Sequence, residues 1–189
     1  MVQKMYVLHV GCGPCNPNKL PARFQLDQWL EIRLDIDPGV RPDVVASITD
    51  MRGIRSASID AVYSSHNIEH LYPHEVDRSL QEFARVLKPN GFALITCPDL
   101  QTVAQSIADG HLEDTLYTSP AGPIAPLDIL YGHRPSLVRG NLFMAHKTGF
   151  TSKTLGQALM RSGFAKARVK RDKEHYNLWA IGWKGGALS

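Results

Sequence analysis

Apolar residues occur in short runs along the chain, and turn residues separate these runs. Residues 6–10 are almost continuously apolar, which is typical of a strand buried on both faces of a parallel sheet. Residues 29–35 alternate apolar and polar side chains and stop at the turn sequence Asp35-Ile36-Asp37-Pro38-Gly39. Further strands are predicted at residues 43–48, 58–65 and 92–97.

A helical stripe lies between Pro73 and Pro89, where apolar side chains recur at Val76, Leu80, Phe83, Ala84 and Leu87. The sequence Lys88-Pro89-Asn90-Gly91 then predicts a helix end and a turn. Thr151 or Ser152 can cap a second helix, which ends at Gly163. Residues 165–171 and 176–183 are expected to form an antiparallel hairpin. Strands that alternate with helical or turn segments indicate an α/β fold with a doubly wound parallel sheet.

Residues 110–150, called the insertion below, interrupt this alternation with repeated proline and glycine. A stretch of this length without a long element is unusual in a compact domain and is more often a binding loop than a spacer. Its polar and aromatic residues include Tyr131 and His146. We therefore interpret residues 1–189 as a single domain in which the insertion acts as a substrate lid.

The first strand ends in a glycine turn, Gly11-Cys12-Gly13, which can lie close to a ligand because glycine carries no Cβ. Asp35 ends the second strand, at the place where a carboxylate binds ribose hydroxyls in nucleotide-binding α/β folds. The glycine turn and Asp35 together predict that a cofactor binds at this edge of the sheet.

Composition narrows the class of protein further. The chain has 189 residues, 43% of them hydrophobic, a net charge of +3 and three cysteines. The cysteines fit a reducing compartment better than a disulfide framework. No leader sequence or apolar run of roughly 20 residues is apparent. We therefore expect a cytoplasmic protein that does not contact a membrane.

Four motifs in order resemble those of class I S-adenosylmethionine-dependent methyltransferases. They are residues 7–13, Asp35-Ile36-Asp37, residues 60–71 (Asp-Ala-Val-Tyr-Ser-Ser-His-Asn-Ile-Glu-His-Leu) and residues 85–91. Within that family the chain is most similar to small bacterial methyltransferases of the type 11 kind. The resemblance implies a Rossmann-like, seven-stranded sheet of order 3-2-1-4-5-7-6, with strand 7 antiparallel and helices on both faces.

The resemblance also implies S-adenosyl-L-methionine as the cofactor and a set of residues around it. Gly11 and Gly13 would pack against its methionine part, Asp35 would hold the ribose, Ser47 and Ile48 would meet the adenine, and Ser65 and His66 would face the methyl group. Cys12 and Ile36 complete the implied contacts, which are Gly11, Cys12, Gly13, Asp35, Ile36, Ser47, Ile48, Ser65 and His66. The chain departs from the family pattern at His9, Cys15 and Ser47.

Methyl transfer to an oxygen or nitrogen atom of a small molecule needs a general base only when the acceptor is a hydroxyl or a protonated amine. Histidine suits this role near neutral pH. His66 is the first candidate because it follows the fourth strand at the ligand-binding edge, and His146 and Tyr131 of the insertion are the second.

Three other interpretations compete with this one. The sequence Cys12-Gly13-Pro14-Cys15 has the spacing of a thiol-disulfide oxidoreductase, but it leaves the remaining motifs unexplained. A metal site could use His66, Glu69, His70 and His74, but Pro73 interrupts their helix and no separate cluster completes the site, so we expect no metal. A non-catalytic module that binds S-adenosylmethionine or S-adenosylhomocysteine is the third.

Nucleic acid is not an expected partner, although Lys166, Arg168 and Lys170 alternate along one predicted strand. Stacking aromatic residues do not interleave with these cations, and basic residues of this kind commonly protect a sheet edge. A small-molecule acceptor therefore remains the expected partner, and a homodimer is compatible with these features.

Overall fold

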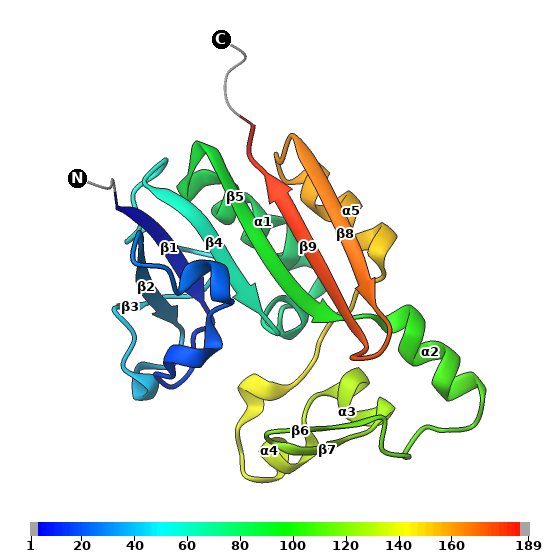
Figure 1. Ribbon diagram of the computed structural model, residues 1–189. Helices are drawn as coiled ribbons and strands as arrows, with labels where there is room; N and C mark the ends of the chain where they lie inside the picture. The colour runs from blue at the N-terminus through cyan, green and yellow to red at the C-terminus, as the bar shows by residue number, and fades with distance from the viewer. Residues whose placement is uncertain (1–3, 186–189) are drawn as a thin grey trace.

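The protein, described over residues 4–185 by a computed structural model, is built on a seven-stranded sheet (Figure 1). The strands are β1 (Met5–Val10), β2 (Trp29–Asp35), β3 (Val44–Val45), β4 (Ile59–Ser65), β5 (Leu87–Pro98), β8 (Lys166–Asp172) and β9 (Asn177–Trp183). Their order is β3-β2-β1-β4-β5-β9-β8. β9 runs antiparallel to both of its neighbours, while the other pairs from β3 to β5 are parallel. The predicted sheet order is confirmed, with β8 and β9 as its sixth and seventh strands.

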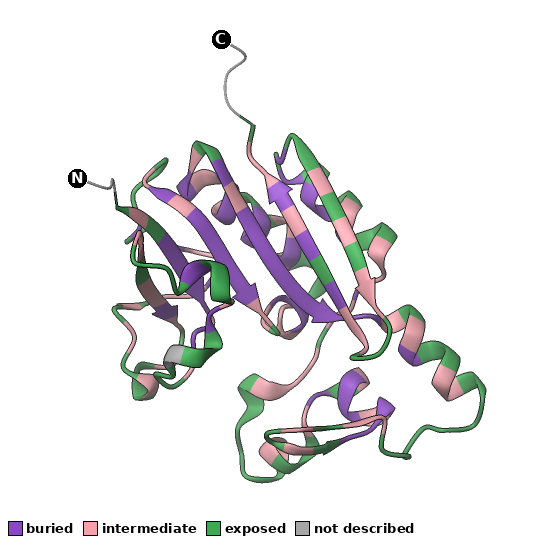
Figure 2. Cartoon of the chain, viewed as in Figure 1, coloured by how far each residue is buried: buried purple, intermediate pink, exposed green. Residues whose placement is uncertain are grey.

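The central strands of the sheet are buried on both faces. Neighbouring residues in these strands point to opposite sides of the sheet, and a separate hydrophobic cluster covers each side. Leu8, Val62 and Ile95 pack with α1 (Pro73–Val86) and α5 (Ser152–Arg161) on one face. Their neighbours Val7 and Leu94 pack on the other face with residues of the segment after β1. That segment holds only two short 3-10 helices, η1 (Pro17–Lys19) and η2 (Ala22–Phe24), as its prolines predict. Figure 2 shows the resulting buried core in β1, β4 and β5.

Some element boundaries differ from the prediction. β3 has two residues instead of six, because the chain turns back at Ser47, whose carbonyl accepts a hydrogen bond from Asp50 N. β5 begins at Leu87, so the residues predicted as a turn lie within an irregular strand whose register against β4 shifts before Phe92. α2 (Leu100–Ala108), capped by Asp99, was not predicted.

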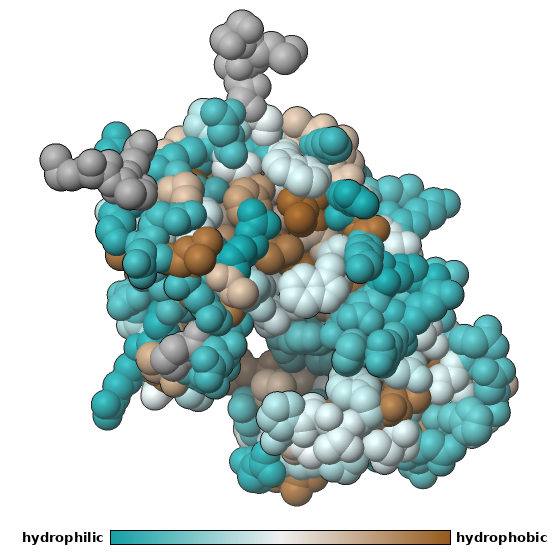
Figure 3. Space-filling model, in the orientation of Figure 1, coloured by the Kyte–Doolittle hydropathy of each residue, from teal (hydrophilic) through white to brown (hydrophobic). Residues whose placement is uncertain are grey.

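The insertion forms a small lobe at the carboxyl ends of the parallel strands (Figure 1). It contains β6 (Tyr117–Ser119), β7 (Gly122–Ile124), α3 (Pro126–Tyr131), α4 (Arg134–Val138) and the 3-10 helix η5 (Leu142–Met144). Ile124 and Ile129 pack on Val103 of α2 and make a core separate from that of the sheet. Figure 3 shows a hollow between this lobe and the turns that follow β1 and β2.

Among the described helices, none has the length and apolar character needed to cross a membrane.

Candidate active site

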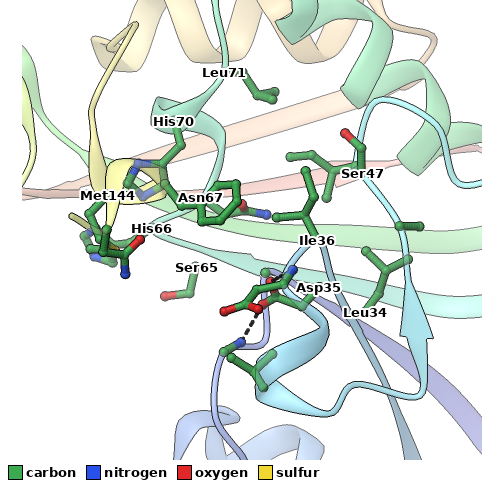
Figure 4. Close-up of a pocket in the computed structure, with 18 of the residues that line it drawn as sticks. Leu34, Asp35, Ile36, Ser47, Ser65, His66, Asn67, His70, Leu71 and Met144 are labelled. Carbon is green, nitrogen blue, oxygen red and sulfur yellow. Dashed lines mark hydrogen bonds between the residues drawn. The ribbon is translucent and has the colours of Figure 1, made fainter. Parts of the chain in front are cut away.

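A cavity of about 500 Å³ opens where β1, β2 and β4 end. Most of the residues that the sequence implied for a cofactor line it, namely Gly11, Gly13, Asp35, Ile36, Ser47, Ile48, Ser65 and His66. Figure 4 shows Asp35 and Ser47 on one side of this space, with His66, His70 and Met144 on the other. Residues from well-separated parts of the sequence therefore meet at one rim.

The glycine turn and the acidic end of β2 are joined directly. Gly13 N donates a 2.7 Å hydrogen bond to Asp35 Oδ2, and Asp37 N donates one of 3.0 Å to Oδ1. Gly11 and Gly13 have φ values of +62° and +59°, a conformation that favours glycine. An added Cβ would lie 2.6 Å from Asn67 Cγ at Gly11 and 2.6 Å from Lys19 Nζ at Gly13. The backbone conformation therefore favours glycine at both positions, and the contact with Asn67 adds to this at Gly11, whereas the flexible Lys19 side chain could move away from Gly13.

Cys12, between the two glycines, is buried and does not line the cavity. Its backbone N donates to Leu34 O at 3.2 Å, which ties the turn to β2. Burial raises the pKa of the Cys12 thiol, whereas Cys15 is exposed. A reactive redox cysteine has the opposite property, a lowered pKa. The structure therefore does not favour the thiol-disulfide interpretation.

His9, which differs from the residue usual at this position of the resembled motif, contacts two residues of the neighbouring strands. Its Nδ1 lies 2.7 Å from Glu31 Oε1 of the neighbouring strand, and its ring packs on Tyr63 with 5.1 Å between centroids. His9 is buried and lies outside the cavity lining. This residue therefore belongs to the packing behind the glycine turn.

His66, the first candidate base, lines the cavity with a half-exposed side chain. Its φ of +47° is unusual for a residue other than glycine, and such strain concentrates at functional sites. Its Nδ1 lies 3.2 Å from Glu69 Oε1. Burial lowers the pKa of His66, but the Glu69 carboxylate outweighs this effect and raises the pKa above its ordinary value. His66 is thus held beside a buried anion.

His146, the second candidate base, is not among the residues that line the cavity. It packs against His70, which does line it, with 4.9 Å between ring centroids. Burial lowers the pKa of His146, so the neutral ring is favoured. Tyr131, a further aromatic residue of the insertion, is 63% exposed on the surface.

Several lining residues were not predicted, and most of them belong to the insertion or to the loop after β4. The insertion contributes Asn141, Phe143, Met144 and Lys147, and the loop contributes Asn67, His70 and Leu71. The position of the loop residues directly after a predicted strand was a usable signal, because ligands bind at that edge of the sheet. The polar and aromatic content of the insertion, which includes Lys147, indicated a substrate lid, but no local signal marked Asn141, Phe143 or Met144.

Residues 8–95 match the family model described as "Methyltransferase domain". This region, a little under half of the chain, is therefore similar to methyltransferase domains. No protein of curated function matches the sequence significantly.

Solved structures of methyltransferases share the fold of this domain. A SAM-dependent methyltransferase from Methanosarcina mazei has a TM-score of 0.64 and 16% identity, over 98% of this chain and 95% of that one. A SAM-dependent methyltransferase from Archaeoglobus fulgidus has a TM-score of 0.59 and 18% identity, over 97% and 87% of the two chains.

A third similar structure contains ligands. It is the 1,6-didemethyltoxoflavin-N1-methyltransferase from Burkholderia thailandensis with bound 1,6-didemethyltoxoflavin and S-adenosylhomocysteine. Its TM-score is 0.60 at 14% identity, over 97% of this chain and 72% of that one. Across these and other similar structures, the chain spans from 47% to 95% of the other chain.

Proposed function

We propose that this protein transfers a methyl group from S-adenosyl-L-methionine to an oxygen or nitrogen atom of a small-molecule acceptor. The observation that carries the proposal is the hydrogen bond from Gly13 N to Asp35 Oδ2, which brings the glycine turn and Asp35 together at the rim of a cavity of about 500 Å³. That volume is in the range usual for cofactor and small-molecule sites, roughly 300–1,000 Å³.

The residues around the cavity fit this cofactor. Each oxygen of Asp35 accepts one backbone hydrogen bond and keeps a second acceptor position, which a ribose hydroxyl can use. Gly11 and Gly13 line the cavity, where their backbone would contact the methionine part, and Ser47 and Ile48 would meet the adenine. When bound, the cofactor supplies an activated methyl group on a sulfonium and brings its own leaving group.

The remaining task of the protein is to orient the acceptor and to manage its proton. Orientation alone is worth up to roughly 7–11 kcal/mol in well-aligned reactions. His66 is the group we assign to accept the proton, because its side chain faces the cavity just past β4. Phe143 and Met144 would cover the acceptor, so the insertion acts as a lid that limits access of water.

Calorimetry with S-adenosylhomocysteine tests the cofactor site. We expect the native protein to bind, and Asp35→Asn to bind at least about tenfold more weakly, since a lost charged hydrogen bond costs about 1.5–3 kcal/mol. Asparagine keeps one acceptor oxygen for the Gly13 amide, but its NH2 group then replaces the oxygen that accepts from Asp37 N, so folding of the variant is checked by urea unfolding. Asp27→Asn is the matched control, because Asp27 is exposed and outside the cavity lining.

Absence of binding by the native protein at high micromolar ligand would remove the proposal. Equal binding by Asp35→Asn would remove the role of Asp35. A panel of hydroxyl and amine acceptors tests turnover, and binding without turnover would show a non-catalytic module instead. His66→Gln is expected to lower turnover on a hydroxyl acceptor roughly a hundredfold, with binding of S-adenosylhomocysteine changed much less.

A further inference from the structure

A cluster of two imidazoles and a carboxylate lies beside the cavity. Glu69 and His70 belong to the 3-10 helix η4 (Ile68–His70) after β4, and His146 comes from the insertion. One potential ligand atom of each residue lies within 4.8 Å of those of the other two. Tetrahedral bonds of about 2.0–2.2 Å to an ion such as Zn²⁺ place its ligand atoms roughly 3.3–3.6 Å from one another. To bind one ion, the three side chains would therefore have to bring their ligand atoms closer by up to about 1.5 Å.

The two imidazoles are already oriented as metal ligands usually are. His70 Nδ1 lies 3.1 Å from Ala145 O, and His146 Nδ1 lies 2.7 Å from Ile129 O. A carbonyl oxygen can only accept a hydrogen bond, so each Nδ1 carries the proton and each Nε2 keeps a free lone pair. Backbone carbonyls hold the second nitrogen of metal-bound histidines in the same way.

Glu69 is the unexplained group of the cluster. Its side chain is 1% exposed, and neither carboxylate oxygen accepts a hydrogen bond of acceptable geometry from any described residue. Such a group is costly to bury. His66 Nδ1 lies 3.2 Å from Oε1, but this contact leaves the second oxygen without a partner. A bound cation would satisfy both oxygens.

The backbone holds the cluster together across the two parts of the chain. Lys147 N and Thr148 N both donate to the carbonyl oxygen of Glu69, at 2.9 and 3.2 Å. These bonds fix the residues that follow His146 against η4. The proximity of the three side chains is therefore built into the contact between the insertion and the sheet domain.

We propose that Glu69, His70 and His146 bind one divalent transition-metal ion that positions and activates a hydroxyl group of the acceptor. Imidazole and carboxylate ligands suit ions such as Zn²⁺, Co²⁺ and Fe²⁺. Three protein ligands leave a coordination position open, as in catalytic metal sites. His70 lines the cavity on the side away from Asp35 and Ser47, so the open position can face an acceptor (Figure 4).

The assignment of a hydroxyl acceptor rests on the proposed methyltransferase activity, whereas the metal site itself does not. A divalent ion lowers the pKa of a hydroxyl group whose oxygen is bound to it. This effect favours O-methylation over N-methylation. In that reaction the acceptor hydroxyl gives its proton to His66, and its oxygen forms a bond to the methyl carbon. The carbon–sulfur bond breaks with its electron pair on sulfur, so S-adenosylhomocysteine leaves as a neutral thioether.

Titration of the metal-free, full-length protein with Co²⁺, followed by its visible absorption, tests the site without any substrate. We expect the native protein to bind one ion per chain. Glu69→Gln and His146→Gln should each bind at least roughly a hundredfold more weakly, since even the loss of a residue that only orients a ligand costs about 10–100-fold. His74→Gln is the matched control, because His74 is exposed near the start of α1 and should leave binding unchanged.

Native protein that binds Co²⁺ and Zn²⁺ with a Kd weaker than about 100 µM would overturn the metal site. Equal affinity in native protein, Glu69→Gln and His146→Gln would also overturn it. Urea unfolding of the same metal-free samples shows whether each variant is folded, and calorimetry of these samples with S-adenosylhomocysteine measures cofactor binding. The calorimetry also separates the two proposals: cofactor binding without metal binding removes only the metal site, and metal binding without cofactor binding removes the methyltransferase proposal and the hydroxyl acceptor.

Discussion

Gly11 illustrates how a single residue connects the first strand to the fourth. Its backbone has a positive φ, and the place of its missing side chain is occupied by Asn67, a residue of the loop after β4 that also lines the cavity. The turn around Gly11 in turn delivers the Gly13 amide to Asp35. The site therefore depends on the missing Cβ of Gly11 as much as on the Asp35 carboxylate.

Gly11→Ala is expected to destabilise the protein by about 2–4 kcal/mol, measured by urea unfolding. A left-handed alanine costs roughly 1–2 kcal/mol, and contact of its Cβ with Asn67 adds to this. Gly140→Ala is the control, since Gly140 also has a positive φ, +85°, but a Cβ added there would meet no other described residue within 4 Å. Equal destabilisation of the two variants would show that the contact with Asn67 contributes nothing.

Among the elements, the short helix α3 shows how the insertion is stabilised without a large core. Asp128 accepts hydrogen bonds from Ala125 N at the start of α3 and from the backbone and side chain of Arg134 at the start of α4. The side chain of Asp128 is 4% exposed. Burial alone would raise its pKa, but the bonds to Arg134 and to the backbone lower the pKa to about 2. One carboxylate thus connects two helices of the insertion.

This pKa predicts an acid-sensitive insertion. Because the folded-state pKa of Asp128 is below its ordinary value of 3.8, its stabilisation is present above about pH 4 and is lost as the pH falls through about 2. We expect Asp128→Asn to destabilise the insertion by about 1–2 kcal/mol at pH 7, measured by hydrogen exchange of residues 117–138. The difference from the native protein should shrink between pH 4 and pH 2. A difference that does not change with pH would contradict the role of the charge.

At the scale of the whole molecule, the cavity joins two parts with separate cores. The ends of β1, β2 and β4 and the residues that follow them supply the glycine turn, Asp35 and Ser47, whereas the insertion supplies the opposite wall. Hydrogen bonds from Lys147 N and Thr148 N to Glu69 O connect the two parts. This division predicts that cofactor binding and acceptor binding respond to different substitutions.

We expect Phe143→Ala combined with Met144→Ala to lower kcat/KM for the acceptor at least about tenfold, because both side chains line the cavity on the insertion side. Binding of S-adenosylhomocysteine should change less than that in calorimetry. Val138→Ala, an 88% exposed position in the same insertion, should leave both values unchanged. A loss confined to cofactor binding would contradict the division of the cavity.

Local sequence patterns predicted much of the sheet and part of the site. β2 begins and ends at the predicted residues, and Thr151 caps α5 as expected. Asp35 and the glycines meet because the carboxyl ends of adjacent parallel strands lie at one edge of the sheet. Residues 88–91 were predicted as a turn but lie within β5, where they form an irregularity between the pair of Leu87 with Ile59 and the pair of Phe92 with Ala61.

The sequence by itself determined the succession of strands in the main sheet and the position of the glycine turn and Asp35 at one edge of that sheet. These features depend on side-chain periodicity and on turn residues, which are properties of neighbours in the chain. Only the tertiary structure brought His146 to Glu69 and His70, and only it placed Phe143 and Met144 at the cavity. The reason is that the path of the insertion is decided by its packing on α2 and by its backbone contacts with η4, and no local pattern encodes contacts between residues so distant in the chain.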